Sequence, residues 1–317
     1  MREALRRWLS TLGGSPAMPV TLDRRRIFVL PTGVGIAWGC ALLAMLLTAI
    51  NYTLSLGFAL VFMLAGLGQV ALLHTFRNLL GLRLQEMQPE PVFAGHPAGF
   101  PIRLDNASNR ARRSLWLAMP GSNAVQFDLD AGQSRTLTLQ LPTHKRGWMT
   151  PVRMTLTTRY PLGLIRAWSY ALPLRRCLVH ARPEAERPPL PLNGAGNGVL
   201  HASGDGSDEF AGLRTHRAAD SPRHVAWKAW ARTSDTPLLT KQFEGGDGGE
   251  LWLDLAQLPD SLTLERKLSR LTGWVLDADA AGLSYGLALP GERIAPSRGP
   301  AHRARALRAL ALHGLPA

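Results

Sequence analysis

The chain contains an unbroken stretch of 50 residues, Ile27 to Phe76, without one Asp, Glu, Lys or Arg. All of the 36 basic and 23 acidic residues lie outside it. One membrane crossing needs about 20 apolar residues at a rise of about 1.5 Å each, so the stretch is long enough for two. A polar turn, Asn51-Tyr52-Thr53, divides it. The sequence therefore predicts a transmembrane helical hairpin within residues 27–76, with helices over Leu30–Ile50 and Leu54–Leu73.

Arginines flank this stretch on both sides. Arg24, Arg25 and Arg26 precede it, Arg77 and Arg83 follow it, and the turn in the middle is uncharged. Because basic residues stay on the cytoplasmic side of a membrane, we expect a multi-pass protein of the inner (plasma) membrane, with both termini and all soluble domains cytoplasmic. A cleaved signal peptide fits less well, since a second apolar segment follows at once and no Ala-x-Ala-like site follows the first.

The predicted helices contain no ionisable residue at their middle, which disfavours a transporter or proton relay. Gly35 and Gly39 form a small-xxx-small spacing, and Gly57, Gly66 and Gly68 would also allow two helices to approach closely. The alternative is that glycine is simply common in membrane helices. In either case we interpret the hairpin as an anchor whose partners are membrane lipids.

Composition narrows the class of protein further. The two cysteines, Cys40 and Cys177, cannot form a disulfide framework or a thiolate zinc site, which suits a reducing cytosol. The formal charge of +13 raises nucleic acid as a partner. Only four of the basic residues are lysine, however, and the arginines are spread along the whole chain. We therefore keep binding to nucleic acid or to anionic lipid as a second alternative function only.

From residue 82 to 180 the pattern has a period of two. Leu137, Leu139 and Leu141 alternate with polar residues, and turn signals such as Pro120-Gly121 and Ala131-Gly132 separate the runs. Short alternating strands at this spacing predict an antiparallel β-sandwich. Further strands are expected at 115–117, 125–129 and 152–156. The arginines at positions 110, 112 and 113 are expected to form a solvated basic loop or a contact with lipid headgroups.

A Pro/Gly-rich segment, residues 181–206, is expected to be a linker to the rest of the chain. Beyond Glu250 the period changes. A buried strand at Leu251–Leu255, a helix capped by Asp260 or Ser261 with an apolar face, a strand at Leu283–Leu289 and a helix at Ala301–Leu312 predict a short parallel β/α unit. The apolar face is expected to comprise Leu264, Leu268, Leu271 and Val275.

The densest polar cluster lies between the linker and this unit. Ser221-Pro222 is a good helix opening, and Arg223, Trp227 and Trp230 would share a face of the helix that follows. The residues proposed as the signature, either binding a partner or forming a structural ion-pair network, are Glu209, Arg214, Asp220, Arg223, Trp227, Lys228 and Arg232.

This cluster resembles the signature of a bacterial family labelled as a domain of unknown function, number fifty-eight. The resemblance rests on Glu-Phe-x-x-Leu-Arg at 209–214, Asp220, Pro-Arg-x-Val-x-Trp-Lys at 222–228, Ala231-Arg232 and Phe243-Glu244, and on Arg-Tyr-Pro-Leu-Gly-Leu at 159–164. Three positions depart from the pattern: His216 replaces a tyrosine, Ala219 a glycine and Trp230 a small residue. The resemblance to this family implies an α+β multidomain protein with an N-terminal membrane hairpin, a β-sandwich and, over residues 207–317, a truncated von Willebrand factor A-like end.

The same resemblance implies a non-enzymatic adaptor or assembly factor for a MoxR-type AAA ATPase. A von Willebrand factor A domain holds Mg²⁺ with Asp-x-Ser-x-Ser, but Asp254 is followed by Leu-Ala-Gln-Leu. One carboxylate cannot supply the oxygen ligands of Mg²⁺, so we expect no metal and no other cofactor.

The alternative is a hydrolase or metal-dependent enzyme that uses Asp208, Glu209, His216 and Asp220, with His224 nearby, for acid–base chemistry. No nucleophile elbow, metalloprotease or nucleotide-binding motif accompanies these residues. We therefore assign no catalytic residue.

Overall fold

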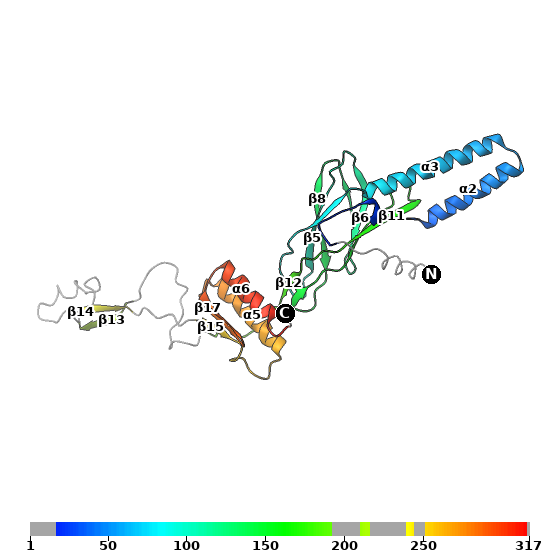
Figure 1. The fold of residues 1–317 in the computed structure, drawn as a ribbon. Helices are drawn as coiled ribbons and strands as arrows, with labels where there is room; N and C mark the ends of the chain where they lie inside the picture. The colour runs from blue at the N-terminus through cyan, green and yellow to red at the C-terminus, as the bar shows by residue number, and fades with distance from the viewer. Residues whose placement is uncertain (1–16, 192–209, 216–238, 244–250, 316–317) are drawn as a thin grey trace. The chain divides into compact units, whose positions relative to one another are not determined.

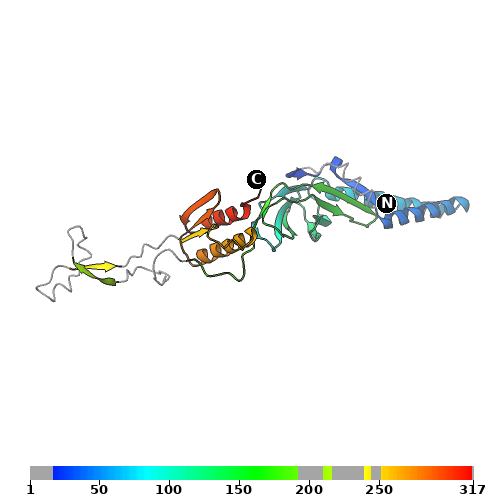
Figure 2. The ribbon, with the colours of Figure 1, turned by 90° about the horizontal axis from the view of Figure 1, so that it is seen from below.

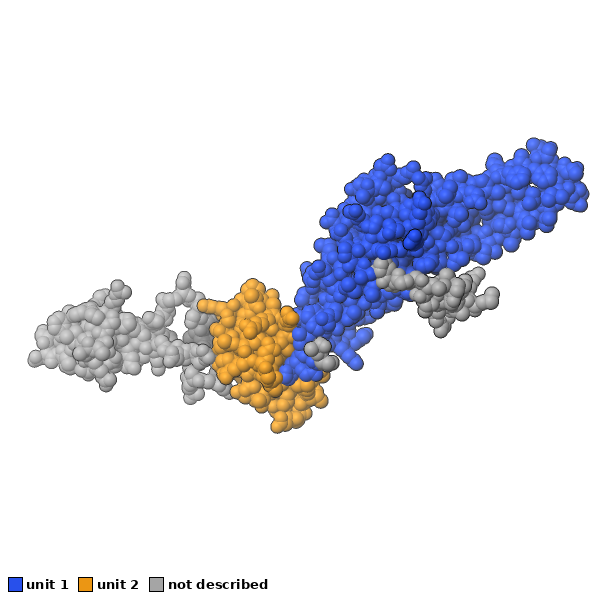
Figure 3. Space-filling model, in the orientation of Figure 1, with its two compact units in different colours: residues 1–182, 311–317 blue, residues 183–310 orange. Residues whose placement is uncertain are grey.

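The protein is described by a computed structural model at residues 17–191, 210–215, 239–243 and 251–315. It is a mixed α+β protein with two apolar helices near the N-terminus and several antiparallel sheets. The chain divides into two units, coloured in Figure 3: residues 1–182 with 311–317, and residues 183–310.

Two helices, α2 (Gly33–Asn51) and α3 (Ser55–Leu79), form an antiparallel pair that projects from the strands of the first unit (Figures 1 and 2). We call this pair the apolar hairpin. Both helices are long and apolar enough to cross a membrane. Only 6% and 11% of their most apolar windows are buried inside the protein. They are therefore not the core helices of a soluble fold, because such helices bury most of their apolar surface.

The helix bounds differ from those expected. Residues Phe28–Pro31 form strand β2, which pairs with β11 (Ile165–Ala171), so Leu30 is not helical. The first helix begins only after Thr32, whose side chain accepts a hydrogen bond from Gly35 N at 3.1 Å and caps the helix. At the other end, α3 runs to Leu79, six residues beyond the expected end. The uncharged stretch therefore contains a strand as well as two helices.

The five hairpin glycines expected to allow close approach of the helices have different environments. A Cβ on Gly57 would lie 3.1 Å from the Cβ of Ala49, and one on Gly68 would collide with the Trp38 ring, so these two allow the helices to approach. At Gly35 an added Cβ would instead meet the backbone of Leu164, which belongs to the strands. Gly39 and Gly66 have no such neighbour within 4 Å. The predicted role in helix pairing thus holds for two glycines.

Two sheets make up most of the first unit, and we call them the two-sheet body. Its first sheet has the order β1-β3-β5-β8 and its second the order β2-β11-β10-β6-β7. All pairs within these sheets are antiparallel. A third, smaller sheet has the order β4-β12-β9. The remaining bounds are β1 Val20–Thr21, β3 Arg83–Glu86, β4 Val92–Phe93, β5 Ala98–Asp105, β6 Arg112–Ala118, β7 Val125–Leu129, β8 Ser134–Leu141, β9 Gly147–Met149, β10 Met154–Thr158 and β12 Cys177–His180, with a 3-10 turn at Arg24–Arg26.

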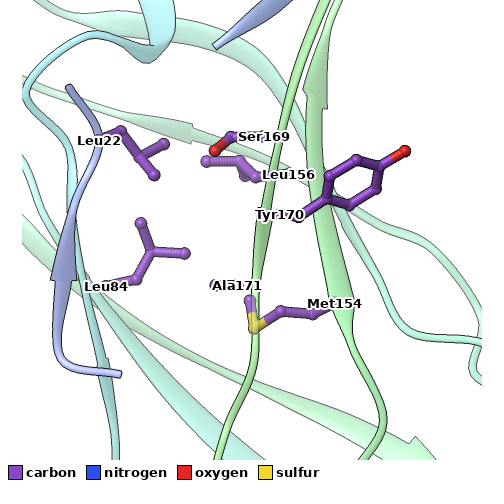
Figure 4. Close-up of a pocket in the computed structure, with 7 residues that line it drawn as sticks. All are labelled: Leu22, Leu84, Met154, Leu156, Ser169, Tyr170 and Ala171. Carbon is purple, nitrogen blue, oxygen red and sulfur yellow. The ribbon is translucent and has the colours of Figure 1, made fainter. Parts of the chain in front are cut away.

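The two sheets share one hydrophobic core. The predicted alternation in β8 is confirmed: Leu137, Leu139 and Leu141 are buried in the core, and the polar residues between them are exposed. Figure 4 shows side chains from both sheets that face this core, among them Leu22, Leu84 and Leu156, and the gap between them has no room for a water molecule. The ring of Tyr170 points away from Leu22 and Leu84 in the same view. Val152, expected in a strand, lies before β10 and is exposed.

The second unit contains β15 (Leu251–Asp254), α5 (Leu264–Ala280), β16 (Tyr285–Leu289), β17 (Glu292–Ser297) and α6 (Pro300–Leu312). As expected, β15 and β16 are parallel and connected through α5. Strand β17, antiparallel to β16, was not expected. The cap of α5 is Thr263, which accepts a hydrogen bond from Arg266 N at 3.4 Å, and not Asp260 or Ser261. On its apolar face Leu264 is 43% exposed, whereas Leu268, Leu271 and Val275 are fully buried.

Candidate functional site

Most of the predicted signature lies outside the described residues. This applies to Glu209, Asp220, Arg223, Trp227, Lys228 and Arg232, and to Asp208, His216 and His224 of the enzyme alternative. Arg214 is placed by its backbone, in strand β13 (Phe210–Thr215), opposite Thr240 of strand β14 (Leu239–Phe243). The two strands are antiparallel, with a register shift between Phe210 and Gly212.

Asp254 lies at the end of β15, where its Oδ1 accepts a hydrogen bond from Ala256 N at 2.9 Å. The carboxylate thus stabilises the turn that leaves the strand. Within the described part of the chain, no group of three or more His, Cys, Asp or Glu side chains is arranged to hold a metal ion.

The best-defined cluster of polar contacts is where the apolar hairpin meets the two-sheet body. We call it the hairpin foot: Thr32, Thr75, Asn78, Arg112 and the loop 159–164. The loop contacts both helices. Thr75 Oγ1 donates to Tyr160 O at 2.7 Å, and Thr32 Oγ1 lies 2.7 Å from Gly163 O and 3.0 Å from Leu164 O. Thr32 N also donates to Leu164 O at 2.8 Å. Each helix is therefore bonded to the same six-residue loop.

The end of α3 is joined to β6 at a bulge. The β6–β7 register shifts between Arg112 and Leu115, and Ser114 has a positive φ of 50°. The side chain of Asn78 pairs with the backbone there: its Nδ2 donates to Arg113 O at 2.7 Å and its Oδ1 accepts from Arg113 N at 3.1 Å. Nδ2 also contacts Thr158 Oγ1 at 2.8 Å. A helix side chain thus supplies hydrogen bonds to the bulged backbone of the strand.

Arg112 makes the opposite contact, in which a side chain of β6 binds the backbone at the end of α3. Its guanidinium donates to the carbonyls of Arg77 and of Leu80, the latter at 2.9 Å, at the C-terminal end of α3. It also donates to Asn106 Oδ1 at 3.3 Å and to Ser108 Oγ at 3.1 Å. The last carbonyls of a helix have no partner within the helix and carry a partial negative charge, which a cation stabilises.

Arg112 is only 6% exposed, and burial lowers the pKa of its guanidinium. The expectation of a solvated basic loop was therefore wrong for Arg112. It holds better for Arg113, which is exposed and pairs with Asp128 and Asp130.

Between the helices, next to the foot, lies an open groove of about 310 Å³. Its walls are apolar apart from Gln69, and Leu164 and Ile165 of the two-sheet body form part of the lining. Trp38, Gly39 and Gly68 line it from the helices.

In the second unit, the first residues of the expected linker pack on α5. We call residues 183–191 the clasp segment. Arg187 forms a bidentate pair with Asp277, and Arg270 Nε lies 2.8 Å from Glu184. Hydrogen bonding by Arg270 lowers the pKa of Glu184, and Asp277 raises that of Arg187. Gly273 makes room for this, since a Cβ there would collide with the Arg187 side chain. This part of the chain is therefore fixed to the second unit and does not act as a free linker.

Two residues of the second unit, Tyr285 and His302, are buried together. Their rings lie 4.7 Å apart, and His302 Nε2 is 2.7 Å from Tyr285 O. The Tyr285 hydroxyl has no hydrogen-bond partner among the described residues, and burial raises its pKa to about 12. Burial keeps this hydroxyl neutral well above physiological pH, and the Tyr285 side chain contributes to the packing of the second unit.

The sequence did not single out Thr32, Thr75 or Asn78, and it suggested a different role for Arg112. Thr75 and Asn78 are polar residues three positions apart at the end of an apolar helix, and this polarity was their only local signal. Arg112 stands in no hydrophobic run, so nothing in the local sequence indicated that it is buried.

Comparison of the chain with protein-family models and with curated proteins finds no match.

Proposed function

We propose that the protein is a non-enzymatic, membrane-anchored adaptor or assembly factor of the cell envelope, in which the apolar hairpin enters the inner membrane. The observation that supports this most directly is the hairpin foot. Two exposed apolar helices are fastened to the two-sheet body by side-chain and backbone hydrogen bonds at Thr32, Thr75, Asn78 and Arg112. Such an anchor holds the body close to the bilayer in a defined orientation, which a flexible tether would not do.

The foot also supports the proposed topology. Both helices end on the same body, so the body lies on one side of any bilayer that the hairpin enters. Arg77 and Arg159 are exposed at this end, whereas the turn at Asn51–Leu54 has no charge. Because arginines favour the cytoplasmic side, we place the body and both termini in the cytoplasm.

For the partner, we propose a MoxR-type AAA ATPase that binds the signature from Glu209 to Arg232. This rests on the family resemblance and on residue type, because Arg and Trp supply a large share of binding energy at protein interfaces. The competing interpretation is that Glu209, Asp220, Arg214 and Arg223 form a structural ion-pair network.

Affinity purification of the full chain from native membranes tests the proposal. We expect an AAA ATPase to be retained by the wild type and lost from Arg223→Ala and Trp227→Ala. The matched controls are Arg305→Ala, at an exposed position of α6, and Trp116→Ala, at a partly exposed position of β6. Both controls should retain the ATPase.

Thermal unfolding of the same four variants separates the two interpretations. An interface residue can be lost without change in the unfolding temperature, whereas loss of a structural network lowers it. If Arg223→Ala and Trp227→Ala both unfold early, the signature is structural. If they fold normally and still retain the ATPase, the docking proposal fails.

A further inference from the structure

The loop of the hairpin foot carries apolar side chains that the protein does not cover. Tyr160 is 41% and Leu162 is 48% exposed. Leu30, which immediately precedes the helix cap region, is 37% exposed. The loop cannot be far from the helix bases, because Tyr160 O accepts a hydrogen bond from Thr75, and Gly163, next to Leu162, is bonded to Thr32. Exposed apolar groups therefore lie close to the point where both helices leave the two-sheet body.

Basic side chains accompany these apolar groups. Arg159 adjoins Tyr160 and is exposed, and Arg77 is exposed two residues beyond Thr75 on α3. No acidic residue opposes them in the surrounding sequence: Asp23 is the only one between Ala17 and Gln85, and residues 131–183 contain none. Arg24–Arg26 lie further away, since strand β2 separates them from α2 by about 20 Å of extended chain at 3.3 Å per residue.

Apolar and aromatic groups next to arginines suit one environment in particular, the boundary between acyl chains and headgroups. Tyrosine and leucine side chains enter this layer, and arginine binds the phosphates of anionic lipids. Continuity with the hairpin adds to the argument, because the surface begins where the apolar helices end.

We infer that Leu30, Tyr160 and Leu162 insert into the interfacial layer of the leaflet next to the two-sheet body, with Arg77 and Arg159 bound to anionic phospholipid headgroups. The two-sheet body thus rests on the membrane through a second contact, made by a loop that follows the hairpin by about 80 residues in sequence. This inference rests on the proposed insertion of the hairpin.

Environment-sensitive fluorescent labels test it in the full chain. Single cysteines are introduced in a Cys40→Ala background, in which Cys177 remains buried, and the protein is reconstituted into vesicles with or without anionic phospholipid. The test position is Leu162→Cys. Leu174→Cys is the matched control, because Leu174 is 55% exposed and follows β11, the strand that begins beside the foot and leads away from it. Leu43→Cys, near the middle of α2 and 58% exposed, reports insertion of the hairpin.

We expect the labels at 43 and 162 to shift to the blue and to lose quenching by aqueous iodide, while the label at 174 remains quenched. The shift at 162 should be larger with anionic lipid, and Arg77→Gln with Arg159→Gln should remove that difference. If 43 is protected but 162 behaves like 174, the hairpin inserts and the loop contact is refuted. If 43 is not protected, both the insertion and the loop contact are refuted. An anionic-lipid effect that survives both substitutions would refute the role of the arginines.

Discussion

Replacing Arg112 by alanine should be one of the most damaging single substitutions in the two-sheet body. The change removes the donors for two carbonyls at the end of α3, those of Arg77 and Leu80. A buried polar group left without its partner costs about 1–3 kcal/mol, so two such groups cost about 2–6 kcal/mol. The neighbouring Arg113→Ala removes the same charge and the same side-chain atoms. Its ion pairs are exposed, and such pairs contribute about 0–1 kcal/mol.

The assay is thermal unfolding of both variants in the same detergent or lipid disc. In a unit of this size, 1 kcal/mol corresponds to a shift of about 2–4 °C in Tm. We therefore expect Arg112→Ala to unfold at least about 4 °C below the wild type and at least about 2 °C below Arg113→Ala. Because Arg112 itself is buried, added salt should change the effect of Arg112→Ala little, whereas any effect of Arg113→Ala should decrease with salt.

Hydrogen exchange shows which part of the first unit loses stability. In Arg112→Ala the amides near the end of α3, from Phe76 to Leu82, should exchange faster, because the last helical turn loses its tertiary contacts. Arg112→Lys should lie between alanine and wild type, since an ammonium keeps the charge but not the planar fork. Equal unfolding temperatures for Arg112→Ala and Arg113→Ala would refute the assignment of Arg112 as the cap of α3.

Three further predictions concern other contacts. Gly35→Ala should destabilise the first unit by about 1–3 kcal/mol, because the added Cβ would overpack against the backbone of Leu164. Gly39→Ala, one helical turn further on, should not destabilise it, because nothing lies within 4 Å of the added Cβ there. Thermal unfolding compares the two variants, and equal effects would contradict the close contact at Gly35. Arg187→Ala should speed hydrogen exchange of the clasp segment, because it removes the ion pair that holds the segment on α5. The control is Arg266→Ala: Arg266 is exposed and lies 3.6 Å from Glu184, so its loss should leave that exchange unchanged. Similar exchange rates in both variants would contradict the role given to Arg187. The raised pKa of Tyr285 means that the unfolded chain ionises first, so stability is fully present below about pH 10 and falls as pH rises toward 12, by about 1.4 kcal/mol per unit. Tyr285→Phe should reduce that fall when unfolding is measured from pH 9 to 11, and an unchanged slope would contradict burial of the hydroxyl.

Elements with a local periodic signal were predictable from the sequence. The two helices followed from an uncharged run of sufficient length, and the alternation of Leu137, Leu139 and Leu141 identified β8. The parallel pairing of β15 and β16 followed from the strand–helix–strand order. In each case the residues that form the element also carry its pattern.

Other elements depended on partners distant in sequence. Residues Phe28–Pro31 are as apolar as the helix that follows, and only pairing with β11, more than 130 residues later, makes them a strand. Pro183–Pro191 has the composition of a linker, yet Arg187 finds Asp277 90 residues away. The burial of Arg112 likewise depends on the end of α3, 32 residues earlier for Leu80. Local composition contains no information on such contacts.

For the hairpin, the amino-acid pattern alone specifies two helices of membrane-spanning length with arginines at their flanks, because both properties depend only on residues that are neighbours in the chain. The attachment of these helices to the two-sheet body depends instead on contacts between distant parts of the chain. The bonds from Thr32 to Gly163 and from Thr75 to Tyr160 join residues 131 and 85 positions apart. Their geometry exists only once the two sheets have formed, since the core of those sheets positions the loop 159–164 and the bulge at Arg112 against the helix ends.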